Sequence, residues 1–378
     1  MLQEWNECRE SLAEALARYV GYTTGAYQLS RIAEVTELFD QAPSRLRLEV
    51  VKSLQLRLQT ETSRNLKEDY AAGITDFAVG LGLVRRIDRG GSLARLALTE
   101  LGRTYRAASG LDLDDFRKFL LQFSVLQFDA DIYGLLLDMA LDEPLPAGSD
   151  LLKYFKGRTL DLRRERTDWL LRAFPDPRLR VRLLQTDAGS TVRWIKNVRG
   201  SEIEIKEIGL DFLRHHATPR RGWLVSLGHL HKDGLLTSSG RRVALRLRGE
   251  SDRFFWLGPP LNWFTRMHVD KALIKEPFSP AWNIIRPSRE NTEQPPFDTV
   301  VRTADFMERA YRYMRLIQAN QVPLDAVKPY IYFLESRTDL RFDEEAVFRA
   351  VFKIFDKRFA PMSQRTGLLG HYQMRKRR

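Results

Sequence analysis

The hydrophobic pattern between residues 66 and 106 changes from helical spacing to strand-like runs and back. Apolar side chains first recur three or four positions apart, which predicts a helix carrying Leu66, Tyr70, Ile74, Phe77 and Leu81. A half-buried strand, Val84–Ile87, then precedes the turn residues Asp88–Ser92, and an apolar strand runs through Leu93–Leu98. Thr99 is expected to cap a further helix with Glu100 in its first turn. The stretch therefore predicts a helix, a basic hairpin and a capped helix.

Helical spacing predicts most of the other elements, so we expect a mainly α fold with small β hairpins. Helices are expected at residues 2–20, 29–39, 44–60, 111–141, 210–216 and 302–359, with a basic helix from about residue 150 and another beginning at Pro219. Two strands, Val192–Val198 and Glu202–Ile208, are expected to pair through a turn at residues 199–201. The apolar helix at 111–141 is expected to pack in the core or at a dimer interface. The aromatic stripes after residue 302 are expected to be core.

The sequence Leu98-Thr99-Glu100-Leu101-Gly102-Arg103 resembles the L-T-x-x-G-R pattern found where the wing of many prokaryotic winged-helix regulators returns to a helix. The resemblance implies a winged-helix DNA-binding fold, in which a helix enters the major groove and the hairpin lies along a phosphate backbone. A second stretch, Gly234–Val243, looks similar. Its hairpin is expected either to be vestigial or to follow at Val243–Phe255.

We therefore expect tandem winged-helix-like modules followed by a helical C-terminal region. Turn-rich segments at residues 142–149 and 276–300 suggest where the parts meet. The expected parts are a winged-helix-like domain (1–110), a connecting helix and linker (111–149), a basic second winged-helix-like domain (150–275), a Pro-rich connector (276–300) and a helical domain with a basic tail (301–378).

Composition limits the kind of protein and the compartment. Among 378 residues there is one cysteine, Cys8, which excludes an internal disulfide framework. No run of eighteen apolar residues occurs, and the first twenty residues carry glutamates where a signal peptide has an apolar core. We expect a cytoplasmic, nucleoid-associated protein with no membrane partner.

The net charge of +12 is unevenly distributed along the chain. Residues 1–150 hold 17 basic and 23 acidic residues, residues 151–260 hold 23 and 12, and residues 261–378 hold 21 and 14. Arginine, whose planar fork suits phosphates and guanine edges, supplies most of the excess. The middle third is therefore expected to supply most of the contacts with double-stranded DNA.

Two sets of residues are candidates for DNA contact. The first hairpin offers Arg85, Arg86, Arg89 and Arg95. The second module offers Thr218, Arg220, Arg221, Arg241, Arg242, Arg246 and Arg248. The helix before the first hairpin is expected to expose a mixed to acidic face, so this module is expected to bind DNA by its wing alone or to bind protein. That face is expected to carry Asn65, Lys67, Glu68, Asp69, Thr75 and Asp76.

An enzymatic alternative rests on Asp187 and on the strand residues Glu202, Glu204 and Lys206. This acidic pattern resembles the PD-(D/E)xK nuclease core, in which carboxylates hold a divalent cation such as Mg²⁺ and the lysine orients or activates water. No P-loop or G-x-S-x-G elbow occurs. His215, His216, His229 and His231 are expected at the surface or along a groove rather than in a zinc site.

The sequence thus favours a non-enzymatic protein that binds double-stranded DNA and needs no cofactor. A transcription regulator, a replication initiator and an adaptor in a mobile-element or phage-defence system all stay open. A regulator should bind a palindromic site as a dimer, whereas an adaptor should need a partner protein. The N-terminal helix and the helix at 111–141 are expected to form the contact with a second copy or with a protein partner. The alternatives are the metal-dependent nuclease and a protein-interaction scaffold.

Overall fold

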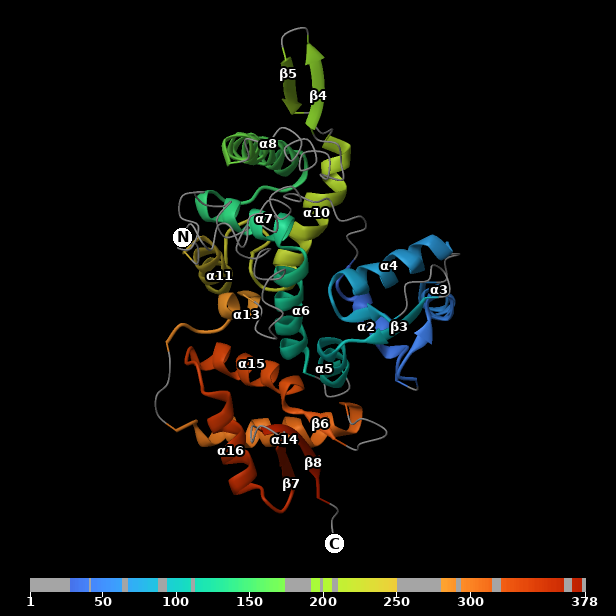
Figure 1. The fold of residues 1–378 in the computed structure, drawn as a ribbon, viewed down its shortest axis with the longest axis vertical. Helices are drawn as coiled ribbons and strands as arrows, with labels where there is room; N and C mark the ends of the chain where they lie inside the picture. Colours follow the sequence, from blue (N-terminus) through green and yellow to red (C-terminus); the bar gives the residue numbers. More distant parts are fainter. Residues whose placement is uncertain are drawn as a thin grey trace. The chain divides into compact units, whose positions relative to one another are not determined.

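The computed structural model describes residues 28–40, 42–62, 67–87, 94–109, 113–173, 192–197, 200–205, 210–249, 280–289, 294–314, 321–363 and 369–375. These residues are mainly helical with small antiparallel sheets, as predicted. They divide into two compact units (Figure 1). Unit 1 holds the described residues from Val125 to Ile284, and unit 2 holds those up to Ser124 and from Ile285 onward. The expected helix at residues 2–20 lies outside the described residues.

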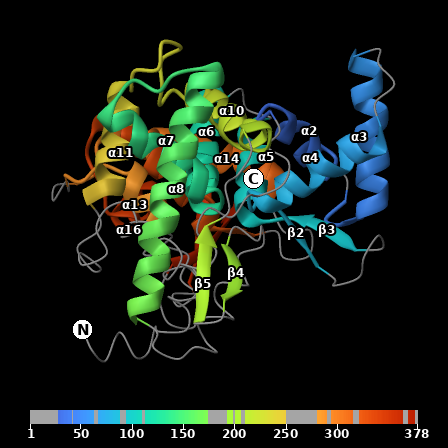
Figure 2. The same cartoon turned by 90° about the horizontal axis from the view of Figure 1, so that it is seen from above.

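Unit 2 begins with a small helical module closed by a hairpin, which we call the N-terminal module (Figures 1 and 2). Its elements are α2 (Arg31–Glu37), β1 (Arg45–Leu46), α3 (Arg47–Thr62), α4 (Glu68–Gly80), β2 (Val84–Arg86) and β3 (Arg95–Leu98), and α5 (Glu100–Ser109) follows. The sheet order is β1-β3-β2, all antiparallel. The predicted hairpin is confirmed to within a residue or two, whereas β1 was not expected. Buried side chains from all three helices and from the hairpin form one core that includes Val35, Leu54, Ile74, Val84 and Leu96.

The predicted single helix at 111–141 is wrong, because the chain bends sharply at its middle. It forms α6 (Asp114–Phe128) and α7 (Ala130–Asp142), which meet at Asp129. In the described part of the chain, no single helix is long and apolar enough to cross a membrane. Helices α6 and α7, a pair bent by 99°, reach that length and composition when taken together. Within unit 2, Phe116 of α6 packs edge-on against Phe306 and Tyr330.

The C-terminal stretch contains a sheet that the sequence analysis missed. Its elements are α14 (Phe297–Met314), β6 (Val322–Pro323), η2 (Leu324–Ala326), α15 (Lys328–Thr338), α16 (Glu344–Ile354), β7 (Phe359–Ser363) and β8 (Leu369–Met374), which together we call the C-terminal module. The sheet order is β6-β8-β7. Both modules thus run helix, strand, helix, helix and hairpin, with the first strand pairing to the last.

The aromatic side chains predicted for the core of this region are buried, except Tyr313 and Phe355, and Phe355 is half-buried. Phe306 stacks on Tyr330 with ring centroids 4.4 Å apart, and Phe348 is 2% exposed. Tyr313 is 44% exposed. The expectation of a purely helical C-terminal region is therefore replaced by a helical core with a small sheet.

Unit 1 is built from α7, α8 (Gly148–Ala173), the hairpin β4 (Val192–Asn197) and β5 (Gly200–Ile205), α10 (Leu210–Ser226), α11 (Ser238–Gly249) and α13 (Pro280–Ile285). The expected break at Pro219 is wrong, because α10 runs through it. Proline costs about 3 kcal/mol inside a helix. The buried side chains of Arg220, Trp223 and Leu224 hold the segment after Pro219 in place.

The segment at 142–149, which was expected to be a linker, packs against the rest of unit 1. Leu145 is fully buried, and its N–H donates to Gly234 O over 2.9 Å. Gly234 packs so closely on this segment that an added Cβ would lie 2.3 Å from Leu145 O. The segment therefore acts as a short edge of unit 1, and α8 begins directly after it.

Candidate nucleic-acid interface

Each unit contains the same arrangement, which we call the corner. In it, one threonine links the end of a helix to the start of a later helix. In unit 2, Gly82 has φ of +70°, and Thr99 Oγ1 donates to Gly82 O over 2.7 Å and accepts from Gly102 N over 3.0 Å. In unit 1, Gly228 has φ of +79°, and Thr237 Oγ1 donates to Gly228 O over 2.6 Å and accepts from Gly240 N over 3.0 Å. The threonine therefore closes the end of one helix and caps the start of the next in both places.

This correspondence corrects the alignment of the second copy. Val84 pairs with Leu98 in the first hairpin, and Leu230 forms a bridge to Leu236 in the second copy. Gly228, not Gly234, therefore corresponds to Gly82, and a turn at residues 231–235 stands where the first copy has its hairpin. The alternative hairpin at Val243–Phe255 is wrong for its described part, because Val243 lies within α11.

The predicted arginines of the first hairpin are accessible wherever the structure describes them. Arg85, Arg86 and Arg95 are exposed, and Arg89 lies outside the described residues. Arg86 Nη2 pairs with Asp76 Oδ1 at 3.1 Å, whereas Arg95 donates to the neutral hydroxyl of Ser44, at 3.0 Å. No carboxylate among the described residues pairs with Arg85 or Arg95. Alternation along the strands places both of these cations on the outer face of the hairpin, beside Ile87, which is 52% exposed.

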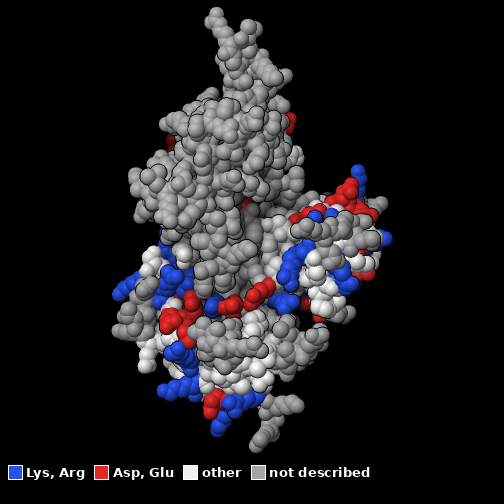
Figure 3. Space-filling model, viewed as in Figure 1, with Lys and Arg blue, Asp and Glu red and all other residues white. Residues whose placement is uncertain are grey.

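Helix α4, which precedes this hairpin, is acidic, as expected. Glu68 and Asp69 are exposed in its first turn. Asp76 bonds both Arg47 and Arg86, so it fastens α4 to α3 and β2. Thr75 is fully buried and donates to Ala71 O, which corrects its expected exposure, and Asn65 lies outside the described residues. Figure 3 shows the resulting mixture of acidic and basic side chains on this module.

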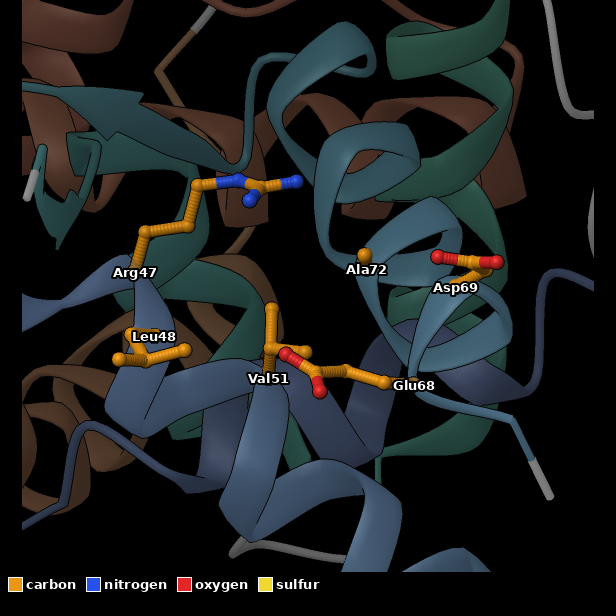
Figure 4. Close-up of a pocket in the computed structure, with 6 residues that line it drawn as sticks. All are labelled: Arg47, Leu48, Val51, Glu68, Asp69 and Ala72. Carbon is orange, nitrogen blue, oxygen red and sulfur yellow. The ribbon is translucent and has the colours of Figure 1, made fainter. Parts of the chain in front are cut away.

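A groove of about 450 Å³ lies between α3 and α4 (Figure 4). Carboxylates stand on its α4 side, a guanidinium stands at its other end, and apolar side chains lie between them. The lining residues are Arg47, Leu48, Val51, Glu68, Asp69 and Ala72.

Arg220 cannot serve as the predicted phosphate contact, because it is buried in unit 1. Its side chain is 1% exposed, and Nε and Nη2 bond the two carboxylate oxygens of Asp129 at 2.5 and 2.7 Å. Nη1 also donates to His216 O at 3.0 Å, and the guanidinium lies over the Trp223 ring. Because Asp129 marks the corner between α6 and α7, this ion pair anchors α10 to that corner.

Three other arginines of the middle region, which were also predicted to contact DNA, form hydrogen bonds within unit 1. Arg248 bonds Asp138 at 2.8 Å and Asp142 at 3.0 Å. Burial disfavours the charge of Arg248, but hydrogen bonds to these two carboxylates outweigh it and raise its pKa. Arg221 donates to Leu145 O and Lys232 O, and Arg246 donates to Ile284 O. These side chains are half-buried and hydrogen-bonded within unit 1, so we do not include them among the proposed DNA contacts.

Of the remaining candidates, Thr218 and Arg241 are exposed and Arg242 is half-buried. Thr218 lies within α10, whereas Arg241 and Arg242 lie in the first turns of α11. They do not form a helix N-terminus with Arg220 and Arg221, because α10 does not begin at Pro219.

Two histidines expected at the surface are buried. His229 is fully buried, and its Nδ1 lies 2.8 Å from Tyr133 Oη, a hydrogen bond whose direction follows the imidazole tautomer. Burial, with a further contribution from Arg242, lowers the pKa of His229 to about 4. His216 is 5% exposed, and burial with the nearby Arg220 charge lowers its pKa to about 4 as well.

The candidate nuclease residues fall largely outside the described part of the chain. Asp187 and Lys206 lie outside the described residues, and the structure describes only the backbone of Glu202 and Glu204. In β5 these two glutamates face Ile195 and Arg193 of β4 in a two-stranded sheet. Among the described residues, no group of three or more His, Cys, Asp or Glu lies close enough to hold a metal ion.

Comparison with known proteins yields no match: no family model, no curated protein and no solved structure is significantly similar to this chain. The case for a function therefore rests on the geometry of the residues.

Proposed function

We propose that this protein binds double-stranded DNA without catalysing a reaction on it, and that the outer face of the β2–β3 hairpin lies along a phosphate backbone. The single observation that carries the proposal is the pair of exposed cations, Arg85 and Arg95, on one face of this hairpin with no carboxylate partner among the described residues. Phosphates are recognised by such accessible guanidinium groups.

The order of elements supports this proposal. Helix, strand, helix, helix and hairpin, with sheet order β1-β3-β2, is the order of a winged helix. In that fold the hairpin is the wing that lies beside the duplex. The Thr99 cap fixes where the hairpin ends, and the Asp76 bonds hold it against α4. The hairpin is thus positioned on a packed core rather than carried on a free loop.

The test is binding to a duplex of defined length as a function of salt, with wild type and an Arg85→Gln/Arg95→Gln variant. Each lost phosphate contact should reduce the slope of log K against log salt by about 0.9, so the slope should fall by about 2. Lys118→Gln/Lys153→Gln, which removes two exposed cations on other helices, is the matched control and should change the slope less.

Unchanged binding by the hairpin variant would remove the hairpin from the interface, and absence of binding at low salt would end the proposal. Repeating the assay with Mg²⁺ and plasmid tests the enzymatic alternative. Cleavage that disappears in Glu204→Ala and Lys206→Ala would contradict a non-catalytic role.

A second candidate function is docking of a basic protein segment on the N-terminal module. The groove between α3 and α4 has an apolar floor with Glu68 and Asp69 at its rim, which suits a partner with lysine or arginine among apolar residues. A Glu68→Lys/Asp69→Lys variant that binds DNA at least as well as wild type but loses a protein partner would favour this function.

A further inference from the structure

The C-terminal module repeats the N-terminal module in the order of its elements and in its sheet order, β6-β8-β7 against β1-β3-β2. Helix α16 therefore occupies the place that α4 has in the first module, directly before the hairpin.

The packing of α16 decides which of its faces is accessible. Its apolar residues Val347, Phe348, Val351 and Phe352 are buried, and α16 packs on α14 and β7. The opposite face consists of Ala346, Arg349, Ala350, Lys353 and Ile354, of which Arg349, Lys353 and Ile354 are exposed. At 100° per residue these five positions form one continuous stripe.

This stripe is basic, in contrast to the acidic face of α4. Arg349 is 70% exposed and shares an i,i+4 pair with Glu345 at 2.7 Å. No carboxylate among the described residues pairs with Lys353 or with Lys357, which follows the helix, although Asp356 is adjacent to Lys357. Figure 3 shows Lys and Arg side chains at the end of unit 2 that carries this module. The side chains of the two alanines are small, so a ligand can approach the helix closely between the cations.

A fourth exposed cation, Arg375, lies beside the end of this stripe. Arg375 N donates to Arg358 O at 3.0 Å, so the chain leaves β8 next to Lys357 and Arg358. Arg358 itself is held by Glu308 and Asp305 of α14 and is a structural residue. Arg375 is exposed and extends the basic surface beyond α16.

We propose that the basic face of α16, with Lys357 and Arg375, is a second DNA-binding surface of unit 2; this inference rests on the proposed function. The partner is duplex DNA, because the major groove of B-form DNA, about 12 Å wide, admits a helix, whereas the major groove of A-form RNA is too narrow for one. Unit 2 then meets the duplex at two places, the β2–β3 hairpin and α16. Linked sites bind more tightly than either site alone when one duplex reaches both.

The test compares two triple variants by salt-dependent binding to a DNA duplex. Arg349→Gln/Lys353→Gln/Lys357→Gln removes the basic face. Arg302→Gln/Arg309→Gln/Arg312→Gln on α14 is the matched control, because Arg302 is also paired at i,i+4, with Asp298 at 2.8 Å, and all three are exposed. The α16 variant should lower the salt slope by about 2 to 3 and the affinity at physiological salt at least tenfold, while the control changes both less.

Four outcomes separate this inference from the proposed function. Loss of affinity in both the α16 variant and the Arg85→Gln/Arg95→Gln variant supports two surfaces. If only the hairpin variant binds more weakly, the α16 surface is wrong and the proposed function stands. If wild type binds no duplex DNA at low salt, both are wrong. If the α16 variant loses affinity only for RNA or for single strands, the assignment to duplex DNA is wrong.

A second variant guards against misfolding of the triple variant. Ala346→Glu/Ala350→Glu places two negative charges on the same face with residues that favour helix. It should reduce DNA affinity while the thermal unfolding midpoint changes little. Wild-type affinity in this variant would overturn the α16 surface.

Discussion

At the scale of single residues, the clearest distinction is between arginines that hold the fold and arginines that remain accessible. Arg220 pairs with Asp129 in the interior of unit 1, whereas Arg85 has no carboxylate partner among the described residues. Removing one partner of a buried ion pair leaves an uncompensated charge, which costs about 3–5 kcal/mol.

We therefore expect Arg220→Met to lower the free energy of unfolding by about 3–5 kcal/mol, because Asp129 would stay buried without its partner. DNA binding by the folded protein should stay at the wild-type level. Urea unfolding followed by circular dichroism measures the free energy of unfolding. A DNA-binding assay at a temperature below the unfolding transition measures binding by the folded protein. Arg214→Met is the control, since Arg214 pairs with Asp211 at the surface and should cost less than about 1 kcal/mol. A stable Arg220→Met protein with weakened DNA binding would contradict this assignment.

The buried His229 predicts a loss of stability in acid. Its pKa is about 4 in the folded protein against about 6.5 when unfolded, so the unfolded state takes up the proton first as pH falls. The stability that the protein has with His229 neutral is fully present above pH 6.5. Protonation of His229 in the unfolded state then lowers the free energy of unfolding by about 3 kcal/mol as the pH falls towards 4. His216 titrates over the same window.

The first copy of the corner supplies the substitution that tests this acid sensitivity. Leu83 occupies the place of His229 there, so His229→Leu combined with Tyr133→Phe removes the imidazole without leaving the hydroxyl unpaired. Unfolding measured at pH 7 and pH 5 should show a smaller difference for this variant than for wild type. An equal difference would mean that His229 does not titrate as its burial requires.

At the scale of elements, the two corners depend on glycines that the pattern L-T-x-x-G-R already contained. An added Cβ at Gly102 would lie 1.9 Å from Leu83 O, and at Gly240 1.9 Å from His229 O. Since these are backbone atoms, the helix has to shift away from the corner to relieve the contact.

Gly102→Ala and Gly240→Ala should therefore each destabilise the protein by about 1–3 kcal/mol, as overpacking does. Gly157→Ala in α8 is the control, because nothing lies within 4 Å of its added Cβ. That change should be neutral or stabilise by up to about 1 kcal/mol, since alanine favours helix over glycine. Thermal unfolding compares all three, and equal midpoints would show that the corners can relax.

The sequence could predict elements where a local rule applied. The alternation around Arg85 and the Thr99 cap predicted the first hairpin and the helix after it. The strands β1 and β6 are two residues long, too short for any periodicity to appear. The bend at Asp129 and the continuity of α10 through Pro219 were missed because tertiary contacts decide both.

At the scale of the whole molecule, a count of charge along the sequence does not show which of the described cations are engaged inside the fold. The middle third has the largest basic excess, yet Arg220, Arg221, Arg246 and Arg248 are engaged in unit 1. No sequence pattern distinguishes these from Arg85, because burial depends on which carboxylates fold beside them. The two modules of unit 2, in contrast, differ in the exposed face of the helix before the hairpin: α4 exposes Glu68 and Asp69, whereas α16 exposes Arg349 and Lys353.

This difference predicts that the acidic residues of α4 weaken DNA binding at the N-terminal module. Because Glu68 and Asp69 lie on the same module as the hairpin, they should repel the phosphates that we propose Arg85 and Arg95 contact. Glu68→Gln/Asp69→Asn should raise duplex affinity several-fold at low salt, and the gain should fade as salt screens the repulsion. Asp114→Asn/Asp115→Asn is a matched control, since both pairs lie in the first turn of a helix and lose the same favourable helix-dipole interaction. If both variants gain equally, only total charge matters; if neither gains, α4 faces away from the duplex and its groove is free for a protein partner.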